Sequence, residues 1–338
     1  MSRADYVLVC FLDALPQPLP PRSIVERVPA STDAWREHLR RRFSDYSAGL
    51  APASAPATPD RSAGLQARAL YLDLGHGQLH GRLLGHGPAR PALLLHEAPG
   101  SSRQMLPLQS ALAAHGVSLA IDLPGTGESS PLPDPSVERI AGVLLEALDA
   151  LGWAEVDVYA EFTSSAFAVE LANRAAGRVH ALALDGLPPA PASEDFLARY
   201  APPIRLSNFG SHLTETWHRL RDLEISWPWF DRSAAAGRRH VPDLDAQRLH
   251  DMTVDVLKQH ESYGDASLAA LRHALAPALA RVRQPVLVYA GGCARGLATQ
   301  AIATALTSAS VTDRPADAET RALKARAFWS GAESAQAR

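Results

Sequence analysis

Hydrophobic residues along the chain gather in short runs that alternate with segments of helical length. Two β-rich runs, 67–74 and 78–84, are joined by Gly75-His76-Gly77, which predicts a β-hairpin. Further apolar runs have the length of buried strands: Ala92–Leu95, Ser118–Ile121, Val156–Ala160, Ala181–Leu184, Val286–Tyr289 and, last, residues 308–312. This alternation predicts an α/β fold with a mostly parallel, twisted sheet and helices on both of its faces.

Two parts of the chain depart from this alternation of strands and helices, and they define the expected domain boundaries. The stretch 187–281 is helix-rich, contains several histidines and separates two strands, so we expect an inserted helical cap. Before the first strand, a segment dominated by Ala, Pro and Ser predicts a flexible linker. The expected organisation is an N-terminal strand–helix appendage (1–46), a linker (47–64), a core (65–186 and 282–330), the cap (187–281) and a disordered tail (331–338).

Composition and charge narrow the classes of function. Of 338 residues, 46% are hydrophobic and 20% are charged, which is typical of a globular protein. Lys and Arg number 33 against 36 Asp and Glu, so no basic surface is expected for nucleic acid or an anionic membrane. The two cysteines form no cluster with metal-ligand spacing, and we expect neither a metal nor a cofactor. The early apolar run 6–12 is too short to span a membrane, and we expect a cytoplasmic protein.

Three local motifs follow predicted strands in a fixed order. They are His96-Glu97-Ala98-Pro99-Gly100, the Asp-x-x-Gly-x-Gly-x-Ser turn at 122–129, and the strand–turn–helix segment at 156–172. Their order resembles the α/β-hydrolase superfamily over about residues 66–330. The resemblance implies an α/β-hydrolase fold, an oxyanion loop at the first motif, and a nucleophile at the tight turn of the third.

The turn that would carry the nucleophile departs from the pattern of that family. Counted back from Glu170-Leu171-Ala172, the nucleophile position falls on Phe162, whose phenyl ring has no lone pair with which to attack. Thr163 and Ser164 are the alternatives as displaced nucleophiles. We expect both hydroxyls instead to satisfy backbone N–H groups in the first turn of the following helix.

The other two catalytic positions also lack their usual residues. The loop after the strand at 286–289 contains no carboxylate, and the last histidine of the chain, His273, precedes that strand. Asp185 follows another buried strand, but it has no histidine to orient, and we expect it to bond backbone in the turn at Gly186. This degenerate triad argues against a conventional Ser–His–Asp hydrolase.

Backbone donors and two carboxylates remain available near the same turn. An oxyanion site does not depend on side chains, so the backbone N–H groups of Glu97, Ala98 and Thr163 are the expected donors. Glu97 and Glu161 flank this place and, with Thr163, are the candidate catalytic residues, because two carboxyl groups in a dry pocket can divide into acid and base roles. The alternative is a solvated loop position for Glu97 and a hydrogen bond to adjacent strands for Glu161.

The cap segment holds the densest cluster of aromatic and ionisable residues. At helical spacing Trp217, His218 and Arg221 share one face, and Asp222 lies four residues after His218, where its carboxylate can orient the ring. Such a face suits a planar or carboxylate-bearing small molecule. The alternative is that the tryptophans form the cap's own core and the charges form a solvated face. The candidate ligand-binding residues are His96, His212, Trp217, His218, Arg221, Asp222 and Trp227.

Three functions remain open from the sequence. The first is an atypical enzyme that acts on a small carbonyl- or carboxylate-bearing metabolite in a pocket between core and cap. The second is a ligand- or partner-binding pseudoenzyme that keeps only the pocket, and the third is an esterase-like hydrolase that uses displaced residues. In each case the partner is a small molecule rather than nucleic acid or membrane, and the N-terminal appendage is the expected contact for a homodimer.

Overall fold

The computed structural model describes residues 7–10, 24–27, separate positions between 34 and 44, 66–189, 191–234, 236–237, 242–290, 299, 302 and 309–336. The chain divides into two compact units, Met1–Gly64 and Leu65–Arg338. None of the helices within these described ranges is long and apolar enough to cross a membrane.

The N-terminal unit contains a pair of short parallel strands. β1 (Val7–Cys10) lies in the apolar run at 6–12, and it pairs with β2 (Ile24–Arg27) in the register Val7↔Ile24. β2 was not expected, since only two of its four residues are apolar. The described positions between 34 and 44 are helical, within the segment expected to form the helix of the appendage.

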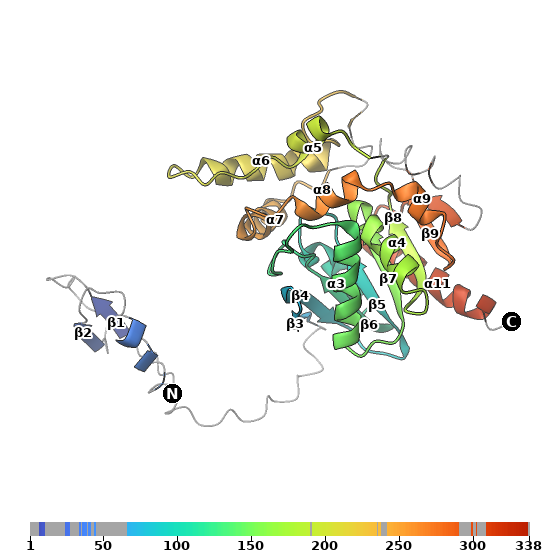
Figure 1. Ribbon diagram of the computed structural model, residues 1–338, viewed down its shortest axis with the longest axis horizontal. Coiled ribbons are helices and arrows are strands. Elements are labelled where there is room, and N and C mark those ends of the chain that lie inside the picture. Colours follow the sequence, from blue (N-terminus) through green and yellow to red (C-terminus); the bar gives the residue numbers. More distant parts are fainter. Residues whose placement is uncertain are drawn as a thin grey trace. The chain divides into compact units, whose positions relative to one another are not determined.

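Eight strands form the sheet of the second unit (Figure 1), in the spatial order β10-β9-β8-β7-β5-β6-β4-β3. The strands are β3 (Arg68–Leu74), β4 (Gly77–Leu84), β5 (Ala89–Leu95), β6 (Gly116–Ile121), β7 (Val156–Glu161), β8 (Val179–Asp185), β9 (Val286–Ala290) and β10 (Ala309–Asp313). β4 runs antiparallel to both of its neighbours, β3 and β6, and the other neighbouring pairs are parallel. The predicted mostly parallel sheet is confirmed, and each strand end lies within three residues of its prediction.

Helices cover both faces of this sheet, because alternate residues of the central strands point to opposite sides. Leu93 and Leu95 of β5 belong to one hydrophobic cluster, whereas Ala92 and Leu94 belong to another. The first cluster is covered by α3 (Val137–Ala150), α4 (Ser165–Arg174), α8 (Asp265–Arg272) and α9 (Leu275–Leu279). The second is covered by α2 (Leu106–Leu112) and α11 (Ala318–Gln336). The segment 331–338 was expected to be disordered, but α11 continues through it as far as Gln336.

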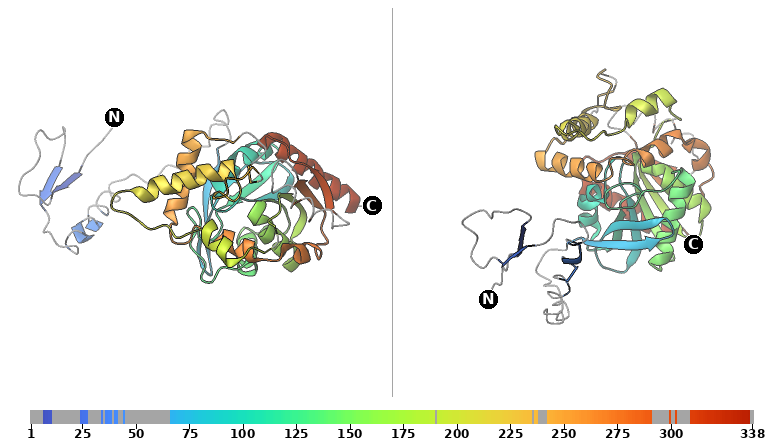
Figure 2. Two further views of the ribbon diagram at one scale, coloured as in Figure 1. Left: turned by 90° about the horizontal axis from the view of Figure 1, so that it is seen from above. Right: turned by 60° about the vertical axis from the view of Figure 1, so that its left-hand side comes forward.

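Three helices between β8 and β9 lie over the carboxyl ends of the strands (Figures 1 and 2). They are α5 (Glu194–Tyr200), α6 (Ser211–Ile225) and α7 (Ala246–Lys258), and they enclose small hydrophobic clusters of their own. Of the next two helices of the expected cap segment, α9 packs into the core cluster, and α8 contributes to that cluster and, through Leu271, to a cluster of the cap. The part of the inserted segment that stands apart from the core therefore ends before α8.

Polar contacts fasten α7 to the loops of the core. The buried carboxylate of Asp255 accepts a hydrogen bond of 2.6 Å from the Ser101 hydroxyl and one of 3.1 Å from the Arg103 guanidinium. Lys258, one turn further along α7, contacts Glu128 at 2.5 Å. Because these bonds involve charged partners, they hold the cap helix against the core more strongly than neutral hydrogen bonds would.

Candidate active site at the strand-to-helix turn

The end of β7 forms a sharp strand-to-helix turn at Phe162. β7 ends at Glu161, a short 3-10 helix η2 (Phe162–Ser164) follows, and α4 begins at Ser165. Phe162 has a φ of 41°, in the left-handed region that costs a non-glycine residue about 1–2 kcal/mol. A phenylalanine thus occupies the strained position of the turn.

The ring of Phe162 is buried between core and cap. It is 2% exposed and packs edge to face on Trp227, with 5.2 Å between ring centroids. Trp227 also contacts Phe196 and Tyr200 of α5, at 5.9 and 6.4 Å. On its other side, the ring lies against Gly186, where an added Cβ would come within 3.5 Å of Cδ2. The position predicted for a nucleophile is therefore part of an aromatic cluster.

The hydroxyl groups after Phe162 are all fully buried and all engaged. Thr163 Oγ1 accepts a hydrogen bond of 3.2 Å from the backbone N–H of Ala98. Ser164 Oγ donates to the carbonyl of His96 at 2.5 Å, and Ser165 Oγ donates to the carbonyl of Gly186 at 2.8 Å. We expected Thr163 and Ser164 to satisfy N–H groups of their own helix, but the three hydroxyls bind neighbouring loops. The loops that would form an oxyanion site are therefore bonded to each other, and the N–H of Ala98 already has an acceptor.

Two carboxyl groups lie beside the turn, as the motifs predicted. Burial, and then the negative charges of Asp185 and Glu97, outweigh two nearby arginines and raise the pKa of Glu161 to about 7. Glu97 is half-buried and contributes to this rise. Among the described residues, none of the adjacent strands forms a hydrogen bond with the Glu161 carboxyl. Glu161 is thus the group beside the turn whose protonation changes near neutral pH.

Asp185 forms the ion-pair cluster of the site. It is the register partner of Glu161 on the neighbouring strand, and its carboxylate lies 2.6 Å from Arg314 Nε and 3.5 Å from Arg321 Nε. The hydroxyl of Tyr159 donates to it at 2.7 Å. Burial alone would raise the pKa of Asp185, but the charge of Arg314 outweighs it and lowers the pKa. The expected bond of Asp185 to the turn at Gly186 is replaced by this cluster.

Arg314 was not singled out from the sequence, although it follows the last strand, where the superfamily places its catalytic base. A signal was available, because a carboxylate at the end of a buried strand requires a positive partner. The loop between β9 and residue 299, which lacks a carboxylate in sequence, lies outside the described residues.

His96 is part of the loop framework. Its ring is fully buried, and Nε2 lies 3.3 Å from both the backbone N–H of Leu123 and the hydroxyl of Thr126. Nδ1 lies 3.0 Å from the carbonyl oxygen of Glu97. Burial lowers the pKa of this histidine. Both ring nitrogens are therefore occupied by the protein itself.

Most of the ligand-binding candidates from the cap lie apart from the turn. His218 is exposed, and His212 accepts a hydrogen bond of 3.1 Å from the backbone N–H of Ser207. The buried face of α6 carries Thr216, Leu220 and Leu223 rather than the predicted face of Trp217, His218 and Arg221. Of the cap candidates, Trp227 is the one with a described contact to Phe162.

Asp222 is buried and bound by two arginines instead of His218. Arg221 Nη2 and Arg232 Nη2 each lie 2.6 Å from one of its carboxylate oxygens. Arg221 also lies over the ring of Trp217, at 5.7 Å from the centroid. These charged side chains of the cap therefore pair with one another. In the described part of the chain, no group of three or more His, Cys, Asp or Glu side chains is placed to hold a metal ion.

Comparison with known structures supports the architecture. A hydrolase from Pseudomonas aeruginosa shares 22% identity over 78% of this chain and 96% of its own, with a TM-score of 0.57. An enol-lactonase from Burkholderia xenovorans shares 19% identity over 80% of this chain and 100% of its own, with a TM-score of 0.55. An esterase from Thermogutta terrifontis shares 17% identity over 80% of this chain and 98% of its own, with a TM-score of 0.57. No family model and no curated protein matches the chain. At these identities the likeness shows the fold, and this chain has the α/β-hydrolase fold.

Proposed function

We propose that this chain binds a small carbonyl- or carboxylate-bearing ligand between core and cap without hydrolysing it. The observation that carries the proposal is the phenyl ring of Phe162, which is buried at the turn and packed on Trp227. A phenyl ring neither attacks an ester nor transfers a proton.

The surroundings of the turn support the loss of hydrolysis. The hydroxyls of Thr163 and Ser164 are buried and bonded to neighbouring loops, so neither is free to act as a nucleophile. After the last strand, Arg314 lies against Asp185, and a guanidinium stays protonated and does not act as a general base. The position of the nucleophile and the position of the base thus carry groups that cannot perform those two steps.

The proposed ligand class follows from the groups that remain. A carboxyl group with a pKa near 7 is partly protonated at neutral pH, so Glu161 can donate a hydrogen bond to a carbonyl or carboxylate oxygen. Trp227 is half-buried, and the part of this residue that remains exposed is the proposed contact for a planar ligand. An apolar wall with few polar groups is the usual composition of a small-molecule site.

Two measurements test the proposal. With p-nitrophenyl acetate and butyrate, we expect turnover no greater than that of the heat-denatured protein. In a thermal-shift screen of small ketones, esters and carboxylic acids, we expect saturable stabilisation that Glu161→Gln weakens and that Glu215→Gln, an exposed carboxyl on α6, leaves unchanged. Ester turnover that Thr163→Ala or Ser164→Ala abolishes would establish the displaced-nucleophile hydrolase and refute the proposal.

A second candidate is an atypical enzyme in which Glu161 is the general acid–base. The observation that favours it is the pKa of about 7 next to Glu97, since general acid–base groups work best when their pKa lies near the operating pH. Ligands from the screen can be incubated with the protein in D2O and followed by proton NMR. Deuterium exchange next to the carbonyl that Glu161→Gln abolishes would establish the enzyme, whereas exchange at the protein-free rate supports simple binding.

A further inference from the structure

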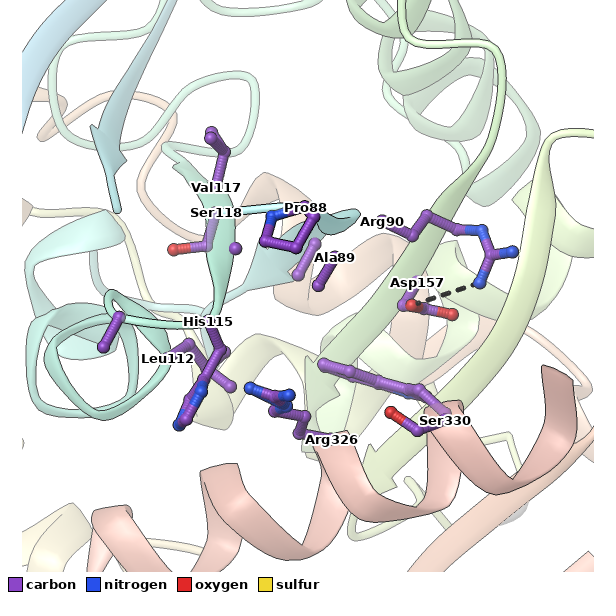
Figure 3. Close-up of a pocket in the computed structure, with 14 residues that line it drawn as sticks. Pro88, Ala89, Arg90, Leu112, His115, Val117, Ser118, Asp157, Arg326 and Ser330 are labelled. Atoms are coloured by element: carbon purple, nitrogen blue, oxygen red, sulfur yellow. Dashed lines mark ion pairs between the residues drawn. The ribbon is translucent and has the colours of Figure 1, made fainter. Parts of the chain in front are cut away.

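A cavity lies at the amino-terminal ends of the central strands, whereas the strand-to-helix turn lies at the carboxyl end of β7. It measures about 390 Å³ and is lined by the amino ends of β5, β6 and β7 together with α2 and α11 (Figure 3). Asp157 in its wall and Phe162 at the turn are five residues apart on β7, which at about 3.3 Å per residue separates them by about 16 Å. The two places are thus separate sites on the same strand.

The negative charge of Asp157, in the wall of this cavity, is already paired with a neighbouring arginine. The carboxylate of Asp157 is 4% exposed, lies 3.6 Å from Arg90 Nη1, and receives a hydrogen bond of 2.9 Å from His180. Arg90 also forms an ion pair of 2.8 Å with Glu155. Arg90 is therefore paired with two carboxylates, of which Asp157 lies in the cavity wall (Figure 3).

A second cation in the wall, Arg326, has a hydrogen-bond donor without an acceptor among the described residues. Arg326 reaches from α11 toward the strand ends (Figure 3), and its Nη1 is buried without a hydrogen-bond partner among the described residues. The indole Nε1 of Trp329, one turn further along α11, is buried and unpartnered in the same described set. Both groups are donors only, so each needs an acceptor that the described residues do not give it. Leaving such groups unpaired is unfavourable unless something supplies one.

We propose that this cavity binds a small monocarboxylate with an apolar body. Arg90 is already paired with Asp157 and Glu155, whereas Arg326 has no ion pair among the described residues, so a ligand with one negative charge would neutralise it. A carboxylate accepts from a guanidinium and an indole N–H at once. Leu112, Val117 and the two alanines at 89 and 92 provide the contact for the apolar body. A volume of about 390 Å³ lies in the range of small-molecule sites.

Benzoate is the probe, measured by isothermal titration calorimetry against benzamide, its neutral analogue, and inorganic phosphate. We expect the wild-type protein to bind benzoate more tightly than either, with an affinity that falls as NaCl is raised. Arg326→Gln should weaken benzoate binding by about tenfold or more, the effect of losing a charge-assisted hydrogen bond. Arg205→Gln, which removes an exposed arginine of the cap, should leave the affinity unchanged.

A second variant, Trp329→Phe, tests the same site in case Arg326→Gln does not fold. Trp329→Phe keeps an aromatic ring and removes the N–H donor, so it should weaken benzoate by about fivefold. Equal affinities for benzoate and benzamide, tighter binding of phosphate, no binding at millimolar benzoate, or an unchanged affinity in Arg326→Gln would each overturn the proposal. Because Glu161→Gln should not affect this site, a failure here is distinguishable from a failure of the proposed function.

Discussion

Replacing Phe162 with alanine and with glycine separates the packing of its ring from the strain of its backbone. Truncating a buried phenylalanine to alanine usually lowers the free energy of unfolding by about 3–5 kcal/mol. The contacts of Phe162 with Trp227 and Gly186 place Phe162→Ala in this range. Glycine would remove the same contacts, but it would also relieve about 1–2 kcal/mol of strain at a φ of 41°. That relief offsets the 0.5–1 kcal/mol by which glycine is ordinarily worse than alanine, so Phe162→Gly should be at least as stable as Phe162→Ala.

Phe167 provides the matched control, since it is a fully buried phenylalanine inside α4. There glycine should be less stable than alanine by about 1 kcal/mol, as in other helix interiors. The assay is urea unfolding of the four variants and the wild type, followed by far-UV circular dichroism. The alanine–glycine difference should therefore differ by about 1–2 kcal/mol between the two positions. If glycine destabilises both positions equally, the turn is unstrained and the reasoning is wrong.

Three further predictions concern charge and domain organisation. Arg314→Gln should destabilise the fold by about 2 kcal/mol, because it leaves Asp185 with one arginine fewer, and adding Asp185→Asn should restore most of the loss in urea unfolding. Glu161 has a folded pKa raised to about 7 from an ordinary 4.5, so stability should fall as pH rises between these values, and Glu161→Gln should unfold at higher urea than wild type at pH 8 but not at pH 4. Deleting residues 1–64 should leave the melting temperature of the remaining unit within about 2 °C of the full chain, because its hydrophobic clusters lie within 65–338, and light scattering on both proteins tests whether the appendage joins two copies.

The strands of the core were predictable from the sequence because their signal is local. Runs such as Leu93-Leu94-Leu95 are apolar at every position, which is the pattern of a strand buried on both faces. The identity of Phe162 at the turn was also readable, since it depends on counting from the adjacent helix. β2 was missed because its four residues carry too few apolar positions.

The polar contacts of the site were not predictable, since they join distant segments. Asp185 and Arg314 are 129 residues apart, and the ends of β8 and β10 come near each other only because β9 pairs with both strands. On α6 the face predicted to meet a ligand was the one that carries the aromatic and ionisable side chains. The structure instead buries the face with Leu220 and Leu223. Hydrophobic periodicity would have identified that face, because burial of apolar surface decides how a helix is oriented.

The hydrogen bond between Ala98 N–H and Thr163 Oγ1 has a consequence for installing hydrolysis at this site. A single Phe162→Ser change would place a hydroxyl at the turn, but Thr163 Oγ1 would still accept from the N–H of Ala98, one of the three expected oxyanion donors. Arg314 would still stand where a base is required. Under the proposed function, installing Ser–His–Asp hydrolysis here would require changes both at the turn and in the segment after β10, which are far apart in the sequence.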